Sequence, residues 1–391
     1  MSSVAEAITI KRARLESVDL LRGVIMLIMA IDHTRDFFGA SSPTDLTQTT
    51  AALFFTRWIT HFCAPVFFLL TGTGAWLSLG KRSKSDLSRF LFTRGLWLIF
   101  LELVVVRCLI LQFNFDYHVT VITVLWALGW SMIALSALIY LPTWLVTTLG
   151  VIMIVAHNLL DPIQSANPIW SILHSPNIIL NHPGHIVFIA YPLIPWIGVT
   201  AAGYGLGQIY AWTPAARQTF LLRLSLALTA AFIVLRAINI YGDPSRWSTQ
   251  PTALFTLLSF LDTTKYPPSL LFLLMTLGPA LLFLRAVDTH TPAFLRPALI
   301  VGKVPLFYYL VHFFLIHLIA VIICYARYGH IYWMFQSPDL ANFPITRPPN
   351  WDLTLPLVYL IWAIVVFALY PLCRRFAALK QTSNAPWLSY L

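Results

Sequence analysis

The sequence predicts an all-α, polytopic integral membrane protein of about ten transmembrane helices with both termini in the cytoplasm. Of its 391 residues, 58% are hydrophobic and only 10% are charged, whereas charged residues make up about 25% of a typical soluble domain. Apolar runs of about 20 residues, the length that crosses a bilayer as a helix, recur from one end of the chain to the other. Basic residues gather between alternate pairs of runs, which is the pattern that sets membrane orientation.

The apolar runs form one continuous series without a low-complexity linker, so we predict a single transmembrane domain over residues 1–391. In chain order the candidate spans lie near residues 18–38, 53–79, 90–112, 119–141, 144–160, 186–210, 220–240, 269–286, 300–325 and 353–373.

The positive charge of the chain is best explained by its orientation in the bilayer. A net charge of +10 also occurs in nucleic-acid-binding proteins, but most of the 25 basic residues lie in alternate connections. We therefore predict a lipid bilayer and no nucleic acid as partner, with 1–17 as a cytoplasmic N-terminal segment and 374–391 as a cytoplasmic tail. The basic residues of the predicted inner side are Lys11, Arg12, Arg14, Lys81, Arg82, Lys84, Arg89, Arg94, Arg217, Arg223, Arg285, Arg296, Lys303, Arg374, Arg375 and Lys380.

Neither disulfides nor a metal site are predicted. The four cysteines lie in or beside apolar segments and show no CxxC spacing,. His182 and His185 form an HxxH pair, but with Asp116 or His118 they still give an incomplete ligand set,. We predict no metal.

The first span is unusual because Asp19, Arg22, Asp32 and His33 interrupt it. Each ionisable residue inside a membrane costs roughly 2.5 to 3.5 kcal/mol and so requires a partner, water or a function. Arg22 and His33 are eleven positions apart, which places them on one helix face and about 16 Å apart along the axis. One face therefore presents a cation near the inner leaflet and an imidazole near the outer one.

Two interpretations of that face remain open. In the first, the protein transfers a group across the membrane: Arg22 holds phosphates of a cytoplasmic donor, and His33 acts as general base on an acceptor hydroxyl or amine. In the second, Arg22 pairs with Asp19 at i,i+3, and an interfacial charge cluster contains Asp32, His33, Arg35 and Asp36.

The residues of this helix also carry a family resemblance. Arg22, ten residues and then His33 resemble the R-x10-H motif of the membrane acyltransferase-3 family. The bacterial family grouped with heparan-alpha-glucosaminide N-acetyltransferase is similar over most of the chain, through the segments RLESVDLLRGVIMLIMAIDHTRDFF, THFCAPVFFLLTGTGAWLS, YPLIPWIGVTAAGYGLG, KYPPSLLFLLMTLGPALL and VPLFYYLVHFFLIH.

The resemblance implies acetyl-CoA bound from the cytoplasm as co-substrate, a histidine that acts in acyl transfer, and an acceptor on the outer face that is commonly a sugar. It suggests Arg22 for donor binding and His33, beside Asp32, for catalysis. The lysosomal enzyme, however, has Asn where His33 aligns, and its proposed active histidine lies in the loop before its second helix, where the nearest counterpart here is His61. The catalytic base is therefore His33 or His61. A homodimer is expected from the resemblance alone.

Other polar residues complete the predicted site. For the coenzyme A phosphates we predict help from the inner-side residues Lys81, Arg82 and Arg89. His312, in a YLVH segment that resembles a late-helix motif of the acyltransferase-3 family, has an ordinary alternative as a histidine bonded to a neighbouring helix. For the acceptor we predict outer-side residues, namely Asp36, Arg57, Arg236, Asn239 and Lys265.

The favoured hypothesis is an acetyl-CoA-dependent O- or N-acyltransferase of the bacterial inner membrane that modifies an envelope saccharide or glycolipid. The main rival is a transporter or flippase, in which the same intramembrane Arg, His and Asp residues form a substrate or proton path.

Overall fold

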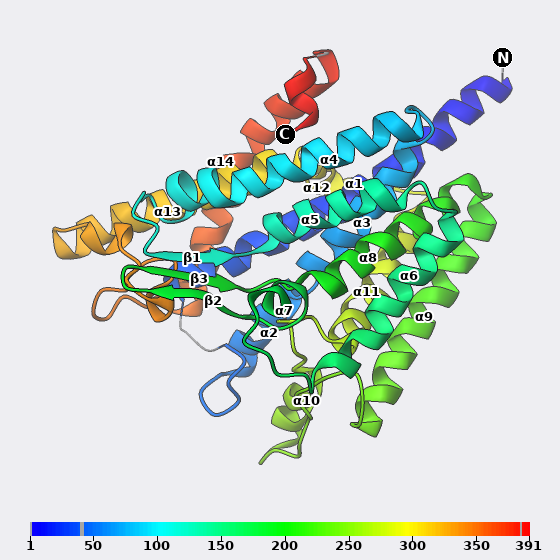
Figure 1. The fold of residues 1–391 in the computed structure, drawn as a ribbon. Coiled ribbons are helices and arrows are strands. Elements are labelled where there is room, and N and C mark those ends of the chain that lie inside the picture. Colours follow the sequence, from blue (N-terminus) through cyan, green and yellow to red (C-terminus); the bar gives the residue numbers. More distant parts are fainter. Residues whose placement is uncertain (1, 40–42, 384) are drawn as a thin grey trace.

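The computed structural model describes the backbone of residues 2–39, 43–383 and 385–391, and side chains from residue 16 onward within these ranges except at 386 and 389. The chain is 70% helix and 5% strand (Figure 1). Its α-helices are α1 (Ser2–Phe38), α2 (Ala51–Thr60), α3 (Cys63–Ser78), α4 (Lys84–Phe100), α5 (Val124–Leu138), α6 (Thr143–Ala156), α7 (Pro168–Leu173), α8 (Leu193–Leu206), α9 (Pro214–Ile238), α10 (Ala253–Leu261), α11 (Leu270–Ala286), α12 (Arg296–Lys303), α13 (Pro305–Tyr328) and α14 (Leu355–Thr382).

Several of these helices are long and apolar enough to cross a membrane, as expected for an integral membrane protein. Among the described residues five segments meet both conditions, and α5 and α11 are shorter apolar helices. The five are Ala51–Ser78, Thr143–Leu160, Pro214–Ile238, Pro305–Tyr328 and Leu355–Thr382. A total of ten spans and the cytoplasmic location of the termini stay predictions.

Helix α1 lies at the centre of the helical bundle, packed against α12, α13 and α14 (Figure 1). It crosses α12 at very short range because glycines face each other. A Cβ atom at Gly23 would lie 1.7 Å from the Ala298 carbonyl oxygen, and one at Gly302 would lie 1.8 Å from the Asp19 carbonyl oxygen. Small residues commonly allow such close helix approach inside membranes. The part of α1 around Asp19 and Gly23 therefore packs directly against the backbone of α12.

The other end of α1 is anchored by the loop before α14. Arg347 donates to the carbonyl oxygens of Asp36 and Gly39, at 2.9 Å each. The indole of Trp351 donates to the carbonyl oxygen of Phe37 at 2.7 Å. These bonds satisfy carbonyl groups that a helix end leaves without partners, and they hold the turn that follows His33 in place.

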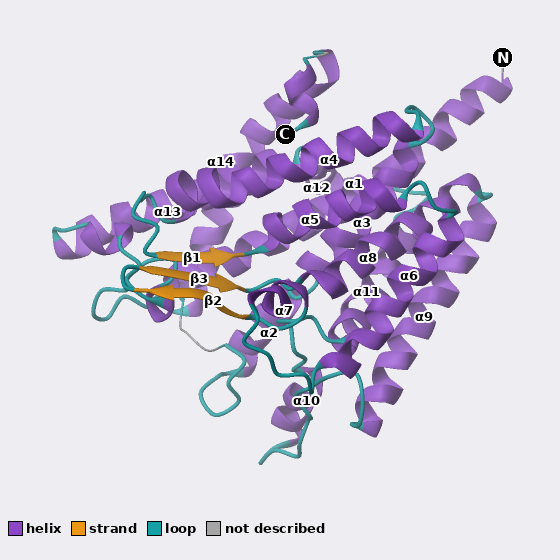
Figure 2. Ribbon diagram, in the orientation of Figure 1, coloured by secondary structure: helices purple, strands orange, loops and turns teal. Residues whose placement is uncertain are grey.

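A three-stranded sheet, in the order β1-β3-β2, corrects the prediction of an entirely helical chain (Figure 2). Strand β1 (Val119–Ile122) pairs in parallel with β3 (His185–Ile189), which pairs antiparallel with β2 (Asn177–His182). The predicted spans 119–141 and 186–210 therefore each begin with a strand. The reason is local: VTVI is β-branched throughout, and Gly184, at φ +86°, permits the tight turn between β2 and β3,.

Two other predicted spans are interrupted or altered helices. The span 53–79 consists of α2 and α3, which meet at a turn around His61 and Phe62. The span 90–112 begins in α4 and continues as a π-helix, η1 (Leu101–Leu111). A π-helix is rare and is found frequently at functional sites.

The predicted terminal segments are partly helical. Residues 2–17 of the predicted N-terminal segment belong to α1, although the side chains of Lys11, Arg12 and Arg14 lie outside the described part. Helix α14 continues to Thr382, well into the predicted tail 374–391. The ends of α1 and α14 project on the same side of the molecule in Figure 1, away from α10.

Candidate functional site

A pair of histidines joins α1 to α13 at the centre of the molecule. Nδ1 of His33 lies 2.7 Å from Nε2 of His312. The His33 ring also stacks on Phe313, with centroids 3.8 Å apart. The ordinary alternative given for His312, a hydrogen bond with a neighbouring helix, is present, and its partner is the predicted catalytic histidine.

The hydrogen bonds around this pair determine where the protons lie. Nδ1 of His312 lies 2.9 Å from the carbonyl oxygen of Tyr308, which can only accept, so Nδ1 must donate. In the neutral ring Nε2 of His312 is then an acceptor, and Nδ1 of His33 must donate to it. Nε2 of His33 therefore carries a lone pair, and no described residue forms a hydrogen bond with it. This is the arrangement that a general base requires.

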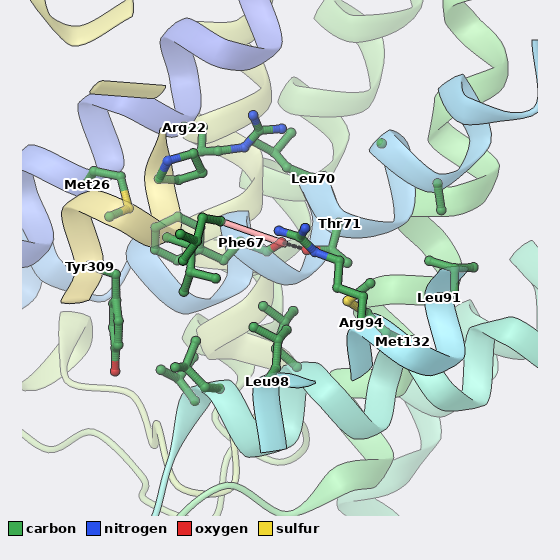
Figure 3. Close-up of a pocket in the computed structure, with 18 of the residues that line it drawn as sticks. Arg22, Met26, Phe67, Leu70, Thr71, Leu91, Arg94, Leu98, Met132 and Tyr309 are labelled. Carbon is green, nitrogen blue, oxygen red and sulfur yellow. Dashed lines mark hydrogen bonds between the residues drawn. The ribbon is translucent and has the colours of Figure 1, made fainter. Parts of the chain in front are cut away.

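A cavity of about 310 Å³ approaches the histidine pair from the side of Arg22. Its walls are mostly apolar, from residues such as Met26, Met29 and Phe67. Figure 3 shows Arg94 reaching toward the space around Phe67, whereas the Tyr309 hydroxyl is directed away from Arg22. The cavity thus combines an apolar lining with charged groups from several helices.

Basic residues from four helices line the same cavity, and they are Arg22 of α1, Arg94 of α4, Lys303 of α12 and Lys380 of α14. Arg22 donates to Asp19 at 2.7 Å and to the carbonyl oxygen of Gly302 at 3.3 Å. The i,i+3 ion pair expected from the sequence is therefore present, and Arg22 still faces the cavity. One carboxylate, Asp19, interacts electrostatically with Arg22, Lys303 and Lys380.

Tyr309 connects the cavity to the histidine pair. It lines the cavity, and its ring centroid lies 6.2 Å from that of His33 and 5.8 Å from that of His312. The buried carboxylate of Glu102, at the start of the π-helix, interacts electrostatically with Tyr309. Oε1 of Glu102 accepts from the backbone and hydroxyl of Thr123 at 2.8 and 2.5 Å, whereas Oε2 has no partner.

Asp32 does not lie free beside His33. Oδ1 accepts from Arg35 at 2.9 Å, and Oδ2 accepts from Arg57 of α2. Arg35 also donates to Asp36 at 2.5 Å. Both oxygens of Asp32 are therefore engaged with guanidinium groups, and its place in the site is that of an ion-pair centre that joins α1 to α2.

His61, the other candidate base, lies near the same charges. It is buried, its ring lies against Phe272 with centroids 5.3 Å apart, and its Nδ1 has no hydrogen-bond partner. Arg57 and Lys265 interact electrostatically with both His61 and His33. His33 has an orienting partner in His312, whereas the described residues give His61 none.

The predicted acceptor residues fall into two groups. Asp36, Arg57 and Lys265 lie with Asp32 near His33. Arg236 instead donates to the carbonyl oxygens of Phe260, Ser245, Ser259 and Asp262 at 3.0, 2.7, 3.1 and 2.5 Å. Asn239 exchanges two hydrogen bonds with the backbone of Trp247. Arg236 and Asn239 therefore organise the loop between α9 and α10.

The predicted phosphate-binding residues Lys81, Arg82 and Arg89 do not line the cavity. Lys81 and Arg89 are exposed, and the Arg82 guanidinium lies over the Phe90 ring at 3.9 Å. The basic lining beyond Arg22 comes instead from Arg94, Lys303 and Lys380. The sequence marked these three only as orientation signals, because nothing in their spacing shows that α4, α12 and α14 converge on α1.

The histidines of the HxxH pair, His182 and His185, are exposed and oppose each other at the turn between β2 and β3. Over the described part of the chain, no group of three or more His, Cys, Asp or Glu side chains is placed to hold a metal ion.

A known protein family matches part of the chain. A family model described as heparan-alpha-glucosaminide N-acetyltransferase, catalytic, matches residues 14–245, which is more than half of the chain. No curated protein matches. The matched part contains Arg22, His33, His61 and Arg94, while Lys265, Lys303 and His312 lie beyond it. The likeness to the acyltransferase-3 motif stays a prediction. Because the family model covers more than half of the chain and several helices are long and apolar enough to cross a bilayer, the chain belongs to the heparan-alpha-glucosaminide N-acetyltransferase family and is an acetyltransferase of the membrane.

Proposed function

We propose that the protein transfers an acetyl group from acetyl-CoA, bound in the cavity, to a saccharide or glycolipid that reaches His33 from the opposite side. The observation that carries this proposal is the position of Tyr309, which lines the basic cavity and also lies edge-on to the His33–His312 pair. The membrane in question is proposed to be the bacterial inner membrane, with the cavity opening to the cytoplasm.

The cavity suits the chemistry of coenzyme A in two respects. Arg22, Arg94, Lys303 and Lys380 provide positive charge for its phosphates, and Arg side chains are well matched to phosphate geometry. The pantetheine arm is uncharged and extended, and the lining by Met26, Met29 and similar residues is apolar. The thioester would then lie at the Tyr309 end, beside the base.

His33 performs the proton transfer in the proposed reaction. Nε2 of His33 takes the proton from the acceptor hydroxyl or amine while the acceptor oxygen or nitrogen attacks the thioester carbonyl carbon. A C–O or C–N bond forms, the C–S bond breaks, and the coenzyme A thiolate takes the proton from His33. His312 keeps Nδ1 of His33 protonated and so keeps the lone pair on Nε2.

Asp32 and the two arginines bound to it support this step from the other side of His33. Because Asp32 is engaged by Arg35 and Arg57, we assign it a positioning role, and we assign Arg57, Asp36 and Lys265 to the acceptor side. His61 lies close to these charges without an orienting partner, so we propose His33 as the base.

The proposal is tested with purified protein in nanodiscs, acetyl-CoA labelled in the acetyl group and a mixture of amino sugars as acceptors. We expect His33→Gln to abolish release of the label while acetyl-CoA still binds, and Arg22→Gln to weaken acetyl-CoA binding at least tenfold. The matched control is His182→Gln, at an exposed histidine remote from the cavity lining, which should leave both properties unchanged. Full transfer by His33→Gln, with loss in His61→Gln instead, would assign the base to His61.

A further inference from the structure

His33 also interacts with positive charges from residues that do not line the cavity. The outer cation cluster, as we name it, consists of Arg35, Arg57 and Lys265 with the carboxylates Asp32 and Asp36. Its members come from α1, from α2 and from the loop between α10 and α11. Along α1 the cavity residue Met29 comes first, His33 follows about one turn later, and Arg35 and Asp36 come two and three residues after His33. An acceptor that approaches His33 from this side meets the cluster first.

The cluster has more positive charge than its own carboxylates neutralise. Asp32 is bound by Arg35 and Arg57, and Asp36 is bound by Arg35. Three cations therefore face two carboxylates. The Lys265 ammonium forms no hydrogen bond with the described residues, and it lies 5.2 Å from the centroid of the Tyr266 ring.

Two buried polar atoms in the same place also lack partners. Nε of Arg35 and Nδ1 of His61 form no hydrogen bond, although these residues are only 5% and 3% exposed. Buried donors in native proteins are nearly always paired with protein, water or a ligand. Because an orphaned guanidinium N–H and an unpaired ammonium are both donors, the missing partner is a group that accepts hydrogen bonds.

The positive charges of the cluster also act on the phenol of Tyr266, which lies outside the membrane-spanning segments. Burial by itself would raise the pKa of Tyr266, but the charges of Lys265 and Arg57 outweigh that effect and hold the pKa below its ordinary value. The side chain of Asp36 is 42% exposed, so the cluster is open to a ligand from outside the bundle.

We propose that the acceptor carries an anionic group, a carboxylate or a phosphate, which Lys265, Arg57 and Arg35 bind while the acceptor hydroxyl or amine reaches Nε2 of His33. This inference rests on the proposed function and adds the charge of its acceptor. The anion belongs either to the saccharide itself or to the phosphate of a lipid headgroup.

The experiment compares a neutral and an anionic sugar with the same amine. Protein in nanodiscs of zwitterionic lipid, saturated with coenzyme A so that the cavity cations are occupied, is titrated with glucosamine and with glucosamine 6-phosphate. We expect the phosphate to bind at least tenfold more tightly. That preference should vanish in Lys265→Met and return in Lys265→Arg. Arg246→Met, at an exposed arginine of the neighbouring loop, is the matched control and should keep it.

A second set of nanodiscs, containing an anionic phospholipid, separates the two sources of the anion. If a lipid headgroup occupies the cluster, this lipid should weaken glucosamine 6-phosphate binding to wild type but not to Lys265→Met. Equal binding of both sugars in both membranes, or a preference unchanged in a Lys265→Met protein with normal thermal unfolding, would overturn the inference. Acetyl release from labelled acetyl-CoA is measured with the same variants in separate nanodiscs without added coenzyme A. Intact release without anion preference refutes this inference alone, whereas anion preference without release refutes the proposed function and leaves an anion-binding site.

Discussion

His33 and His312, from the first helix and from a helix near the other end of the chain, lie 2.7 Å apart between Nδ1 and Nε2. Because His312 donates its own Nδ1 proton to the Tyr308 carbonyl oxygen, this contact leaves the lone pair of His33 on Nε2. One interhelical bond therefore sets both the orientation and the tautomer of the proposed base.

The first prediction follows from that bond. His312→Phe fills the space of the ring but cannot accept from His33, so both tautomers of His33 become available. We expect acetyl transfer to fall on the order of 10²-fold, as when a general base loses its alignment, with little change in the Michaelis constant for acetyl-CoA. Steady-state rates in nanodiscs check this. His182→Phe is the control, and an equal effect of the two variants would show that the bond has no role in the reaction.

The second prediction concerns the cavity as the donor site. Gly74 of α3 lines the cavity, and a Cβ atom there would meet nothing within 4 Å. Gly74→Phe should therefore place its ring in the cavity without disturbing the fold, and we expect acetyl-CoA binding to weaken at least tenfold. Equilibrium binding of acetyl-CoA measures the effect. If the variant binds acetyl-CoA as wild type does, the donor lies elsewhere.

The third prediction concerns the crossing of α1 and α12. Gly302→Val places its side chain where a Cβ atom alone would lie 1.8 Å from the Asp19 carbonyl oxygen, and overpacking typically costs about 1 to 3 kcal/mol or more. We expect a clearly lower midpoint of thermal unfolding in detergent. Gly74→Ala, at a helical glycine with open space, serves as the comparison and should equal or exceed wild type. Similar midpoints for Gly302→Val and Gly74→Ala would mean that the two helices do not pack this closely.

The fourth prediction uses Asp262, in the loop after α10. Burial and the like charge of Asp243, partly offset by Arg236, raise the pKa of Asp262 from 3.8 to about 6. The folded protein then binds more protons than the unfolded chain between these values, so stability falls as pH rises through this range, and the full penalty applies above pH 6. Asp262→Asn should therefore stabilise the protein at pH 8 by up to about 3 kcal/mol and give no gain at pH 4.

Asp161, just after the predicted span 144–160, has a pKa shifted in the opposite direction from that of Asp262, so its replacement should change stability in the opposite direction. Burial raises its pKa, but the hydrogen bonds from His174 and Asn158 outweigh burial, so the pKa of Asp161 lies below its ordinary value. Asp161→Asn should therefore destabilise the protein at neutral pH, and the difference should shrink as the pH falls below the unfolded pKa. Thermal unfolding from about pH 3 to about pH 8 compares both variants. If Asp262→Asn and Asp161→Asn both stabilised or both destabilised the protein at pH 8, the charge environments described for the two carboxylates would be contradicted.

The extent of helix and the position of the first charged helix were predictable from the sequence, because hydropathy is a local property. The sheet was not, because residues 119–122 and 186–189 lie inside apolar runs that match a helical span equally well. The β-branched residues and the Pro183–Gly184 turn favoured strands. Whether these segments form strands, however, depends on pairing between β1 and the distant β3.

The candidate site was only partly predictable for a similar reason. Arg22 and His33 stood out because charges are rare inside a span. The partner His312 and the cavity residues Lys303 and Lys380 depend on which helices meet, and no feature of their own sequence environment reports that. The sequence analysis missed Glu102, although a glutamate in an apolar run is unusual. Its segment was interpreted only as a membrane span, and no role was assigned to the carboxylate.

The most direct test of the central claim uses acetyl-CoA carrying ¹⁴C in the acetyl group and ³H in the adenine, enclosed in liposomes with the protein in the cytoplasm-in orientation and a mixture of amino sugars outside. The account predicts that ¹⁴C appears on an external sugar while ³H stays inside as free coenzyme A, and that His33→Gln abolishes both changes. Movement of both labels to the outside in a fixed ratio would indicate a transporter, and retention of both labels inside by folded protein that binds acetyl-CoA would contradict acetyl transfer.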